Sequence, residues 1–188
     1  EVNHNDVFTF VSVGTVCTRK NQRVLLEIAR SKEIIKPIRF IVVGGGPDLP
    51  FCEKLVEKYS LSDCVEFVGP SNDVASYLSQ ADAFISTSYD EGLPTVALEA
   101  MSCSLPLVLT DVGGCSELIK GNGVLVSGCS PADIVAGINT FLDSFSRGEI
   151  SGEASLELFQ KHYRTESMCD EYAGLIKGLI EPHRQPNT

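Results

Sequence analysis

The sequence predicts an α/β domain, a Rossmann-like three-layer α/β/α arrangement around a mainly parallel sheet of six strands. Six short runs rich in valine, isoleucine, leucine and phenylalanine recur along the 188 residues, and segments with helical periodicity lie between them. Near-continuous apolar strands that alternate with helices are typical of a parallel sheet covered on both faces. A chain of this length also suits one domain with a sizeable core.

Each predicted strand is a β-rich run bounded by glycine, proline or polar residues. The strands lie at 7–14, 38–44, 65–69, 83–88, 106–110 and 123–126. Amphipathic segments between them predict helices at about 20–33, 48–60, 72–81, 94–103 and 115–120. Pro94 suits the first turn of one of these helices, because its missing N–H costs nothing there.

The chain after the sixth strand is predicted to be helical. Ser130 as N-cap, Pro131 at the first position and Asp133 in the first turn predict a helix that ends near residue 145. A polar, glycine-containing break at 145–155 precedes two further helical patterns, at about 153–163 and 166–180. The tail at 182–188 is expected to be frayed.

Composition and charge exclude several classes of partner. A net charge of −10 opposes broad electrostatic attachment to nucleic acid or to an anionic membrane. No run approaches the roughly 18 to 20 apolar residues that a membrane span needs. The seven cysteines are an odd number without a C-x-x-C pair, which favours reduced buried thiols and a cytosolic location. Because the chain starts with Glu1, we expect it to be cut from a longer protein.

The predicted topology places the candidate site at one edge of the sheet. Ligands of such sheets bind outside the carboxyl ends of the strands, where loops such as 14–20 and 88–94 lie. Two glycine-rich turns, GGGPD at 44–48 and DVGG at 111–114, follow strands and suit either a tight turn or the close approach of a ligand. By themselves they do not choose between the two.

Other chemistries lack their sequence signs. The histidines at 4, 162 and 183 have no zinc-binding spacing, and no G-x-S-x-G occurs. No D-x-D occurs either, which removes the commonest sign of a metal-chelated sugar-nucleotide diphosphate. We therefore expect neither a metal ion nor another cofactor.

Two sets of charged residues have both a structural and a functional interpretation. Glu99, inside DEGLPTVALEAM, is either a solvated residue of an amphipathic helix or a ligand. Arg19, Lys20 and Arg23 form either a solvated first helical turn or an anion site. Cations near a helix N-terminus are locally unfavourable, so Lys20→Ala is expected to leave thermal stability unchanged or slightly raised.

Several motifs in order resemble one known family. EGLPTVALE has the form E-x7-E, and it is followed by LPLVLTDVGG and then Glu117. Before it come SVGTVCTRKNQ, IVVGGGP and VEFVGPSNDVASYLSQADAFISTS. Together these stretches resemble the nucleotide-sugar half of a retaining glycosyltransferase of the large group 1 family, which has the two-domain GT-B fold. The resemblance covers residues 8–180.

The resemblance implies a role for each matched residue. Glu91 would bind hydroxyls of the donor sugar, and Glu99 would bind the ribose diol, a task that suits a carboxylate because it accepts two charge-assisted hydrogen bonds. Lys20, with Arg19, would neutralise the diphosphate and stabilise it as it leaves. Backbone N–H groups at the helix start would face phosphoryl and sugar oxygens. The remaining donor-binding positions would be Gly44, Gly69, Asn72, Gly92, Leu93 and Thr95.

The chain departs from the family pattern at two positions. Thr15 stands where the family often has arginine, so one phosphate contact is missing or is supplied by Arg19. Ser104 stands where glycine is usual, and its small side chain is expected to keep the turn. The acceptor domain of a GT-B enzyme is absent, so residues 1–188 would form the donor-binding domain alone, with a core at about 7–146 and C-terminal helices at about 153–181.

Three functions follow from this interpretation. The first is the donor-binding half of an enzyme that transfers a sugar from a nucleoside diphosphate sugar, without a metal, to an acceptor. The alternatives are half of a nucleotide-sugar epimerase and a non-catalytic nucleotide-sugar-binding or scaffolding module. The family implies polysaccharide or glycolipid assembly at the cytoplasmic face of a membrane, with peripheral membrane association of the full-length protein. The C-terminal helices are expected to pack on the missing domain.

Overall fold

The structure is a computed structural model that describes residues 7–180, so the tail expected to fray at 182–188 lies outside the described residues. All six predicted strands are present in one sheet, in the order β3-β2-β1-β4-β5-β6. Every neighbouring pair is parallel, which confirms the predicted fold class. The strands are β1 Phe8–Val13, β2 Ile38–Val43, β3 Val65–Gly69, β4 Ala83–Ser86, β5 Leu107–Thr110 and β6 Gly123–Val126.

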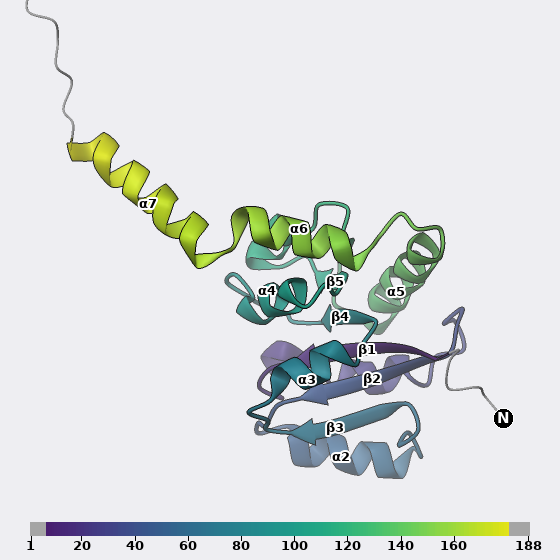
Figure 1. The fold of residues 1–188 in the computed structure, drawn as a ribbon. Helices are drawn as coiled ribbons and strands as arrows, with labels where there is room; N and C mark the ends of the chain where they lie inside the picture. The colour runs from purple at the N-terminus through teal and green to yellow at the C-terminus, as the bar shows by residue number, and fades with distance from the viewer. Residues whose placement is uncertain (1–6, 181–188) are drawn as a thin grey trace, which may run out of the picture.

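Helices cover both faces of the sheet, as Figure 1 shows. One face packs against α1 Val24–Ile28, α2 Leu49–Lys58 and α5 Pro131–Ser146, with Phe10, Phe40 and Phe141 fully buried between them. The other face packs against α3 Val74–Ser79, α4 Thr95–Ser102, the 3-10 helix η3 Gly113–Leu118 and α6 Gly152–His162. Burial of apolar side chains on both faces explains why the strands read as continuous hydrophobic runs.

Two predicted helices are wrong in type or length. The segment predicted as one helix at 20–33 begins at the last residue of a three-residue 3-10 helix, η2 Thr18–Lys20, and contains the short α1. Asn21 separates them because its backbone is left-handed, with φ of 54°, which ends a right-handed helix. The segment 115–120 is the 3-10 helix η3, which starts two residues earlier, at Gly113. Periodicity alone does not report these local changes of backbone conformation.

The predicted caps are largely confirmed. Ser130 and Asp133 form a complete capping box at the start of α5, and Pro131 is its first residue. Pro94 is the N-cap of α4 and lies one position before its first helical residue, Thr95. The N-cap of α3 is Asp73, whose carboxylate accepts a hydrogen bond from the Ser76 N–H.

The last helix, α7 Thr165–Ile180, projects away from the sheet and its covering helices (Figure 1). Its exposed large apolar side chains recur at helical spacing, at Met168, Tyr172, Leu175, Ile176 and Leu179. No helix of the described residues is long and apolar enough to span a membrane.

The seven cysteines all lie in the described part of the chain and are free thiols. Burial raises the pKa of the Cys52 thiol to about 11, so this thiol stays protonated at neutral pH. Cys169, on α7, is exposed, contrary to the expectation that the thiols are buried. Its helix lacks a covering layer, whereas Cys52 on α2 and Cys115 on η3 are buried in the cores on the two faces of the sheet.

Candidate ligand site at the carboxyl edge of the sheet

The candidate site lies where the chain connections leave the sheet in opposite directions. β1 and β4 are neighbours in the sheet, although β2 and β3 separate them in sequence. The connection after β1 passes through α1 on one face, whereas the connection after β4 passes through α4 on the other. In open α/β sheets this divergence leaves a crevice at the carboxyl ends of the two strands, and ligands bind there.

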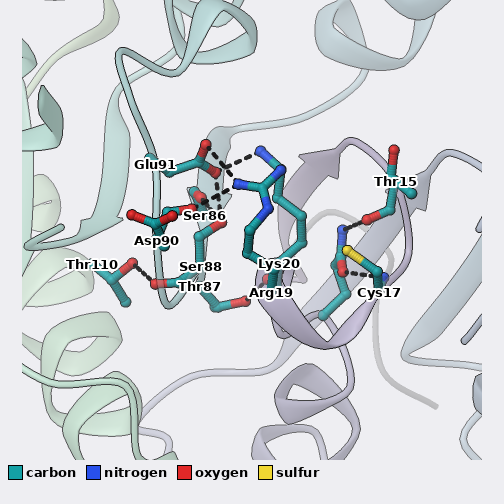
Figure 2. Close-up of polar contacts among 11 residues, drawn as sticks. Thr15, Cys17, Arg19, Lys20, Ser86, Thr87, Ser88, Asp90, Glu91 and Thr110 are labelled. Atoms are coloured by element: carbon teal, nitrogen blue, oxygen red, sulfur yellow. Dashed lines mark hydrogen bonds and ion pairs between the residues drawn. The ribbon is translucent and has the colours of Figure 1, made fainter. Parts of the chain in front are cut away.

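The two loops at this crevice meet through an ion pair, shown in Figure 2. Lys20 Nζ, from the loop after β1, lies 2.5 Å from Glu91 Oε1, in the loop after β4. The Ser88 hydroxyl donates to the same carboxylate oxygen over 2.6 Å. Arg19 Nη1 donates to the Asp90 carbonyl and lies 3.6 Å from Glu91 Oε2. Two basic side chains therefore face one acid at the end of the central strands.

Glu91 is held in its ionised form. Burial opposes ionisation of this side chain, which is 7% exposed, but the hydrogen bonds from Lys20 and Ser88 favour the carboxylate. The positive charges of Lys20 and Arg19 act in the same direction, and together these contacts lower the pKa of Glu91 below 4.5. At neutral pH the carboxylate is thus available as a hydrogen-bond acceptor.

The N-terminal end of α4 borders the same crevice. Gly92 and Leu93 are exposed in the loop that leads to it, and Thr95 is exposed in its first turn. Glu99 is also exposed, one helical turn after Thr95, and therefore lies on the same side of the helix. Ala97 and Met101, on the same helix, are fully buried. The structure leaves the Glu99 carboxylate accessible to solvent or to a ligand.

Gly44 and Gly69 lie farther along the same edge, at the ends of β2 and β3. The Gly44 N–H donates to the Gly69 carbonyl over 2.8 Å. A Cβ on Gly44 would lie 2.0 Å from the Gly14 carbonyl oxygen, so only glycine allows the β1 and β2 loops to pack this closely. Gly44 thus has a structural role at the start of the loop that carries Lys20. Asn72 is exposed just beyond β3.

Sequence comparison gives the family. The sequence model of the family described as glycosyl transferases group 1 matches residues 1–153. The chain belongs to this family. Its curated relatives include the D-inositol 3-phosphate glycosyltransferase of Paenarthrobacter aurescens, which is 30% identical over 95% of this chain and 47% of the relative. The N-acetyl-alpha-D-glucosaminyl L-malate synthase of Bacillus anthracis is 28% identical over 86% of this chain and 44% of the relative.

Solved structures of glycosyltransferases share the fold of this group 1 domain. Anabaena HepE in complex with UDP and glucose superposes with a TM-score of 0.78 and 20% identity, over 92% of this chain and 49% of HepE. The galactosyltransferase WaaB gives a TM-score of 0.75 and 21% identity, over 91% of this chain and 49% of WaaB. The chain therefore spans less than half the length of these relatives, and it has the fold of one half of a GT-B protein.

Three hydroxyl side chains near the ion pair of the group 1 domain were not identified from the sequence. Thr87 donates to the carbonyl oxygens of Lys20 and Asn21, and Thr110 donates to the carbonyl of Ser88 over 2.7 Å. Thr87, Ser88 and Thr110 are all buried behind the ion pair (Figure 2). A signal was present, because STS at 86–88 ends an otherwise apolar strand. The partners of Thr87 and Thr110, however, lie on other loops and are not visible in the sequence.

A separate pocket of about 640 Å³ opens on the α1 side of the same edge. Arg23, Phe51 and Tyr89 line it, whereas Lys20 and Glu91 do not. Arg23, the third member of the basic cluster, stacks on the Phe51 ring at 5.1 Å rather than joining Arg19 and Lys20 at the crevice.

Within residues 7–180, no group of three or more histidine, cysteine, aspartate or glutamate side chains could hold a metal ion.

The ion pair predicts a specific dependence of stability on pH. Because the folded-state pKa of Glu91 lies below 4.5, its contribution to folding is present above about pH 4.5 and is lost as pH falls through the folded-state pKa. Glu91→Gln removes this contribution at neutral pH. We expect the wild-type and Glu91→Gln domains to differ in thermal stability at pH 7 and to converge in acid, because protonated Glu91 is also neutral.

Melting temperatures measured across this pH range by circular dichroism test the prediction. Glu66→Gln is the matched control, since Glu66 pairs with Arg39 at the same 2.5 Å but is 47% exposed. Ion pairs between exposed side chains contribute little to the stability of the folded state. A difference for Glu91→Gln that is no larger than that for Glu66→Gln at pH 7 would contradict the stabilising role of the pair.

Proposed function

We propose that the chain is the donor-binding half of a glycosyltransferase that transfers a sugar from a nucleoside diphosphate sugar to an acceptor. One observation carries the proposal: Lys20 and Glu91 form an ion pair in the crevice at the carboxyl ends of β1 and β4, beside the start of α4. The chain that brings them together belongs to the group 1 family. The family gives the reaction class, and the geometry gives each charged residue a position from which it can act.

Lys20 would act on the diphosphate. Its ammonium group has three N–H donors, and one of them contacts Glu91, so two can reach phosphate oxygens. When the bond between the sugar and the diphosphate breaks, the leaving group gains negative charge, and a fixed cation next to it lowers the barrier. Arg19 adds a second cation and would supply the contact that Thr15 cannot make. The proposal includes transfer that needs no metal ion and retains the anomeric configuration.

Glu91 and Glu99 would hold the two ends of the donor. Glu91 is ionised and nearly buried beside Lys20, so it suits hydroxyls of the sugar next to the phosphates. Glu99 is exposed one turn into α4 and suits the ribose diol. The N–H groups at the start of α4 would face phosphoryl and sugar oxygens. Gly44, Gly69 and Asn72 would lie near the base, at the ends of β2 and β3.

The two acids are expected to respond differently to removal of their charge. Glu99→Gln should weaken nucleoside diphosphate binding by about 1 to 3 kcal/mol, the cost of a lost charged hydrogen bond. Glu91→Gln should spare the bare nucleotide and weaken only its sugar conjugate. Calorimetric titration with UDP and UDP-glucose, the ligands of the HepE complexes, measures both effects. Glu57→Gln, on the exposed face of α2, is the control.

The acids would lose these roles under two outcomes. If Glu99→Gln and the Glu57→Gln control bind UDP equally well, Glu99 is a solvated helix residue. If Glu91→Gln binds UDP and UDP-glucose like wild type, Glu91 serves the structure of the crevice but does not contact the sugar.

The proposed partner of this domain is the acceptor-binding half of the full-length protein. The chain covers less than half of each relative described above, so the matched region is one part of each of them. The apolar side chains of α7 face solvent and would pack against that half. We place the full-length enzyme in the cytoplasm, in peripheral contact with a membrane. Nucleic acid has no role in the proposal.

A transfer assay tests the function. The 188-residue chain alone should bind donor weakly and transfer no sugar, because half of the cleft and the acceptor site are missing. The protein with its N-terminal region restored should transfer sugar in the presence of a chelator. Turnover by the 188-residue chain alone would contradict the proposal. A requirement for divalent metal in the longer protein would contradict metal-independent transfer.

A further inference from the structure

We propose that Thr87 is a positioning residue: its hydroxyl holds the backbone of Lys20 and Asn21 and thereby fixes the Lys20 ammonium against Glu91. The contact joins the two loops of the crevice across 67 residues of sequence. The meaning of this contact for catalysis rests on the proposed function, whereas its geometry does not. Figure 2 shows Thr87 between Lys20 and Ser88.

Thr87 is placed to do this by the end of β4. The strand ends at Ser86, so Thr87 is the first residue of the following loop, and it is 2% exposed. Its Oγ1 lies 3.2 Å from the Lys20 carbonyl oxygen and 3.1 Å from the Asn21 carbonyl oxygen. The single hydroxyl proton is shared by these two acceptors. A buried hydroxyl with two carbonyl partners has little freedom to reorient. Its removal takes a donor from the Lys20 carbonyl, whereas the Asn21 carbonyl still accepts from the Val24 N–H over 3.0 Å.

The backbone around Lys20 needs an external support. The helix η2 has only three residues, and its N-cap, Cys17, makes no side-chain capping bond. Asn21 then adopts a left-handed conformation, which asparagine tolerates better than most residues with a side chain and which ends the right-handed turn. Because short 3-10 turns have weak hydrogen-bond geometry, this segment depends on contacts from its surroundings. Thr87 supplies such a contact at the turn itself.

The contact also sets the separation of the two charges. Thr87 precedes Glu91 by four residues in the same loop, and the Tyr89 N–H donates to the Arg19 carbonyl over 2.8 Å between them. The loop with the acid therefore binds the backbone of the loop with the cations. A lysine side chain has several rotatable bonds and loses entropy when it is held in one place, so a shift of its backbone loosens the ion pair. Thr87 prevents that shift.

Two substitutions of Thr87 test the hydroxyl group and the shape of the side chain separately. Thr87→Val keeps the shape and removes the donor, whereas Thr87→Ser keeps the donor. Ser155→Ala is the matched control: it removes another fully buried hydroxyl, which contacts Asn122 and no residue of the crevice. If Thr87→Val does not fold, Thr87→Cys replaces it, because a thiol is a weak donor of similar size. The pKa of Glu91 is read from the 13C signal of its side-chain carboxyl, and UDP and uridine affinities are measured by calorimetry.

The expected result is specific to Thr87. In Thr87→Val the pKa of Glu91 should rise toward 4.5, as the ion pair loosens. UDP should bind about tenfold more weakly because the backbone that carries Lys20 has shifted, a change that Glu91→Gln does not make, while uridine binding is unchanged. Thr87→Ser and Ser155→Ala should leave both readouts as in the wild type. A purely structural role would lower thermal stability in Thr87→Val and Ser155→Ala alike, without moving the pKa of Glu91.

Two further outcomes separate this inference from the proposed function. An unchanged pKa of Glu91 in folded Thr87→Val or Thr87→Cys would overturn the inference, whatever the domain binds. A pKa of Glu91 that rises in Thr87→Val, in a domain whose wild type binds no nucleoside diphosphate, would support the positioning role and count against the proposed function.

Discussion

Lys20→Ala is expected to weaken nucleoside diphosphate binding about a hundredfold, or ~2.7 kcal/mol, and to leave free nucleoside binding nearly unchanged. The reason is that the ammonium group would neutralise the diphosphate, which a nucleoside lacks. UDP and uridine titrations at low and moderate salt measure the difference, and the effect should shrink as salt rises. Arg39→Ala is the control, since Arg39 also pairs with a glutamate at 2.5 Å but lies at the opposite end of the sheet's strands.

The structure changes the expected effect of Lys20→Ala on stability. The sequence placed Lys20 at the start of a helix over 20–33, where a cation is unfavourable, and predicted unchanged or slightly raised stability. Lys20 instead ends η2 and pairs with Glu91, whose side chain is 7% exposed. Removing Lys20 leaves that carboxylate with Arg19 at 3.6 Å as its nearest cation. We therefore expect a loss of about 1 to 3 kcal/mol in stability.

Two outcomes would count against Lys20 as the phosphate ligand. One is an equal loss of affinity for UDP and uridine, which would indicate a general disturbance of the crevice. The other is wild-type affinity for both. In either case Arg19 would be the remaining cation of the crevice that could meet a phosphate, because Thr15 carries no charge.

Gly113→Ala is expected to disrupt the Glu91 loop and to destabilise the domain by about 3 kcal/mol or more. A Cβ at Gly113 would lie 1.7 Å from the Glu91 carbonyl oxygen and 2.7 Å from its carbonyl carbon. The φ of Gly113, 53°, adds backbone strain for any other residue. Since backbone atoms cannot rotate away, either η3 or the loop 87–94 must move. The movement should also weaken UDP-glucose binding.

Gly121→Ala is a control that introduces backbone strain without a clash between the new Cβ and neighbouring atoms. Gly121 has φ of 82°, but a Cβ there would meet no atom within 4 Å. This control should cost only about 1 kcal/mol of backbone strain. Urea denaturation of both variants gives the comparison, with calorimetry for the ligand. If Gly113→Ala is no less stable than Gly121→Ala, the close contact between η3 and the Glu91 loop does not exist in solution.

Ser104 shows how a departure from the family pattern is accommodated. The sequence predicted that a small residue would preserve the turn where glycine is usual. The structure keeps the turn after α4, but with Ser104 at φ of 60°, a conformation that costs a residue with a side chain about 1 kcal/mol. A Cβ on Gly152 would lie 1.8 Å from the Ser104 carbonyl oxygen, so glycine at the start of α6 allows this helix to pack closely against the Ser104 turn.

Local patterns in the sequence were enough to predict the fold class and the nature of most elements. Strand runs, helical periodicity and the Ser130–Asp133 capping box depend on neighbouring residues, and local backbone preferences suffice to interpret them. The same local information marked the loops after β1 and β4 as the candidate site. Lys20 and Glu91 were identified through motifs that resemble the group 1 family.

Which of these residues meet depends on the folding of the whole chain. The strand order brings β1 and β4 together, so Lys20 and Glu91, 71 residues apart in sequence, form an ion pair. It also gives Thr87 and Thr110 their partners, and it places the Lys20 turn, with the left-handed Asn21 that ends it, against the β4 loop. Such contacts depend on the pairing of distant strands, and periodicity within a short segment carries no information about that pairing.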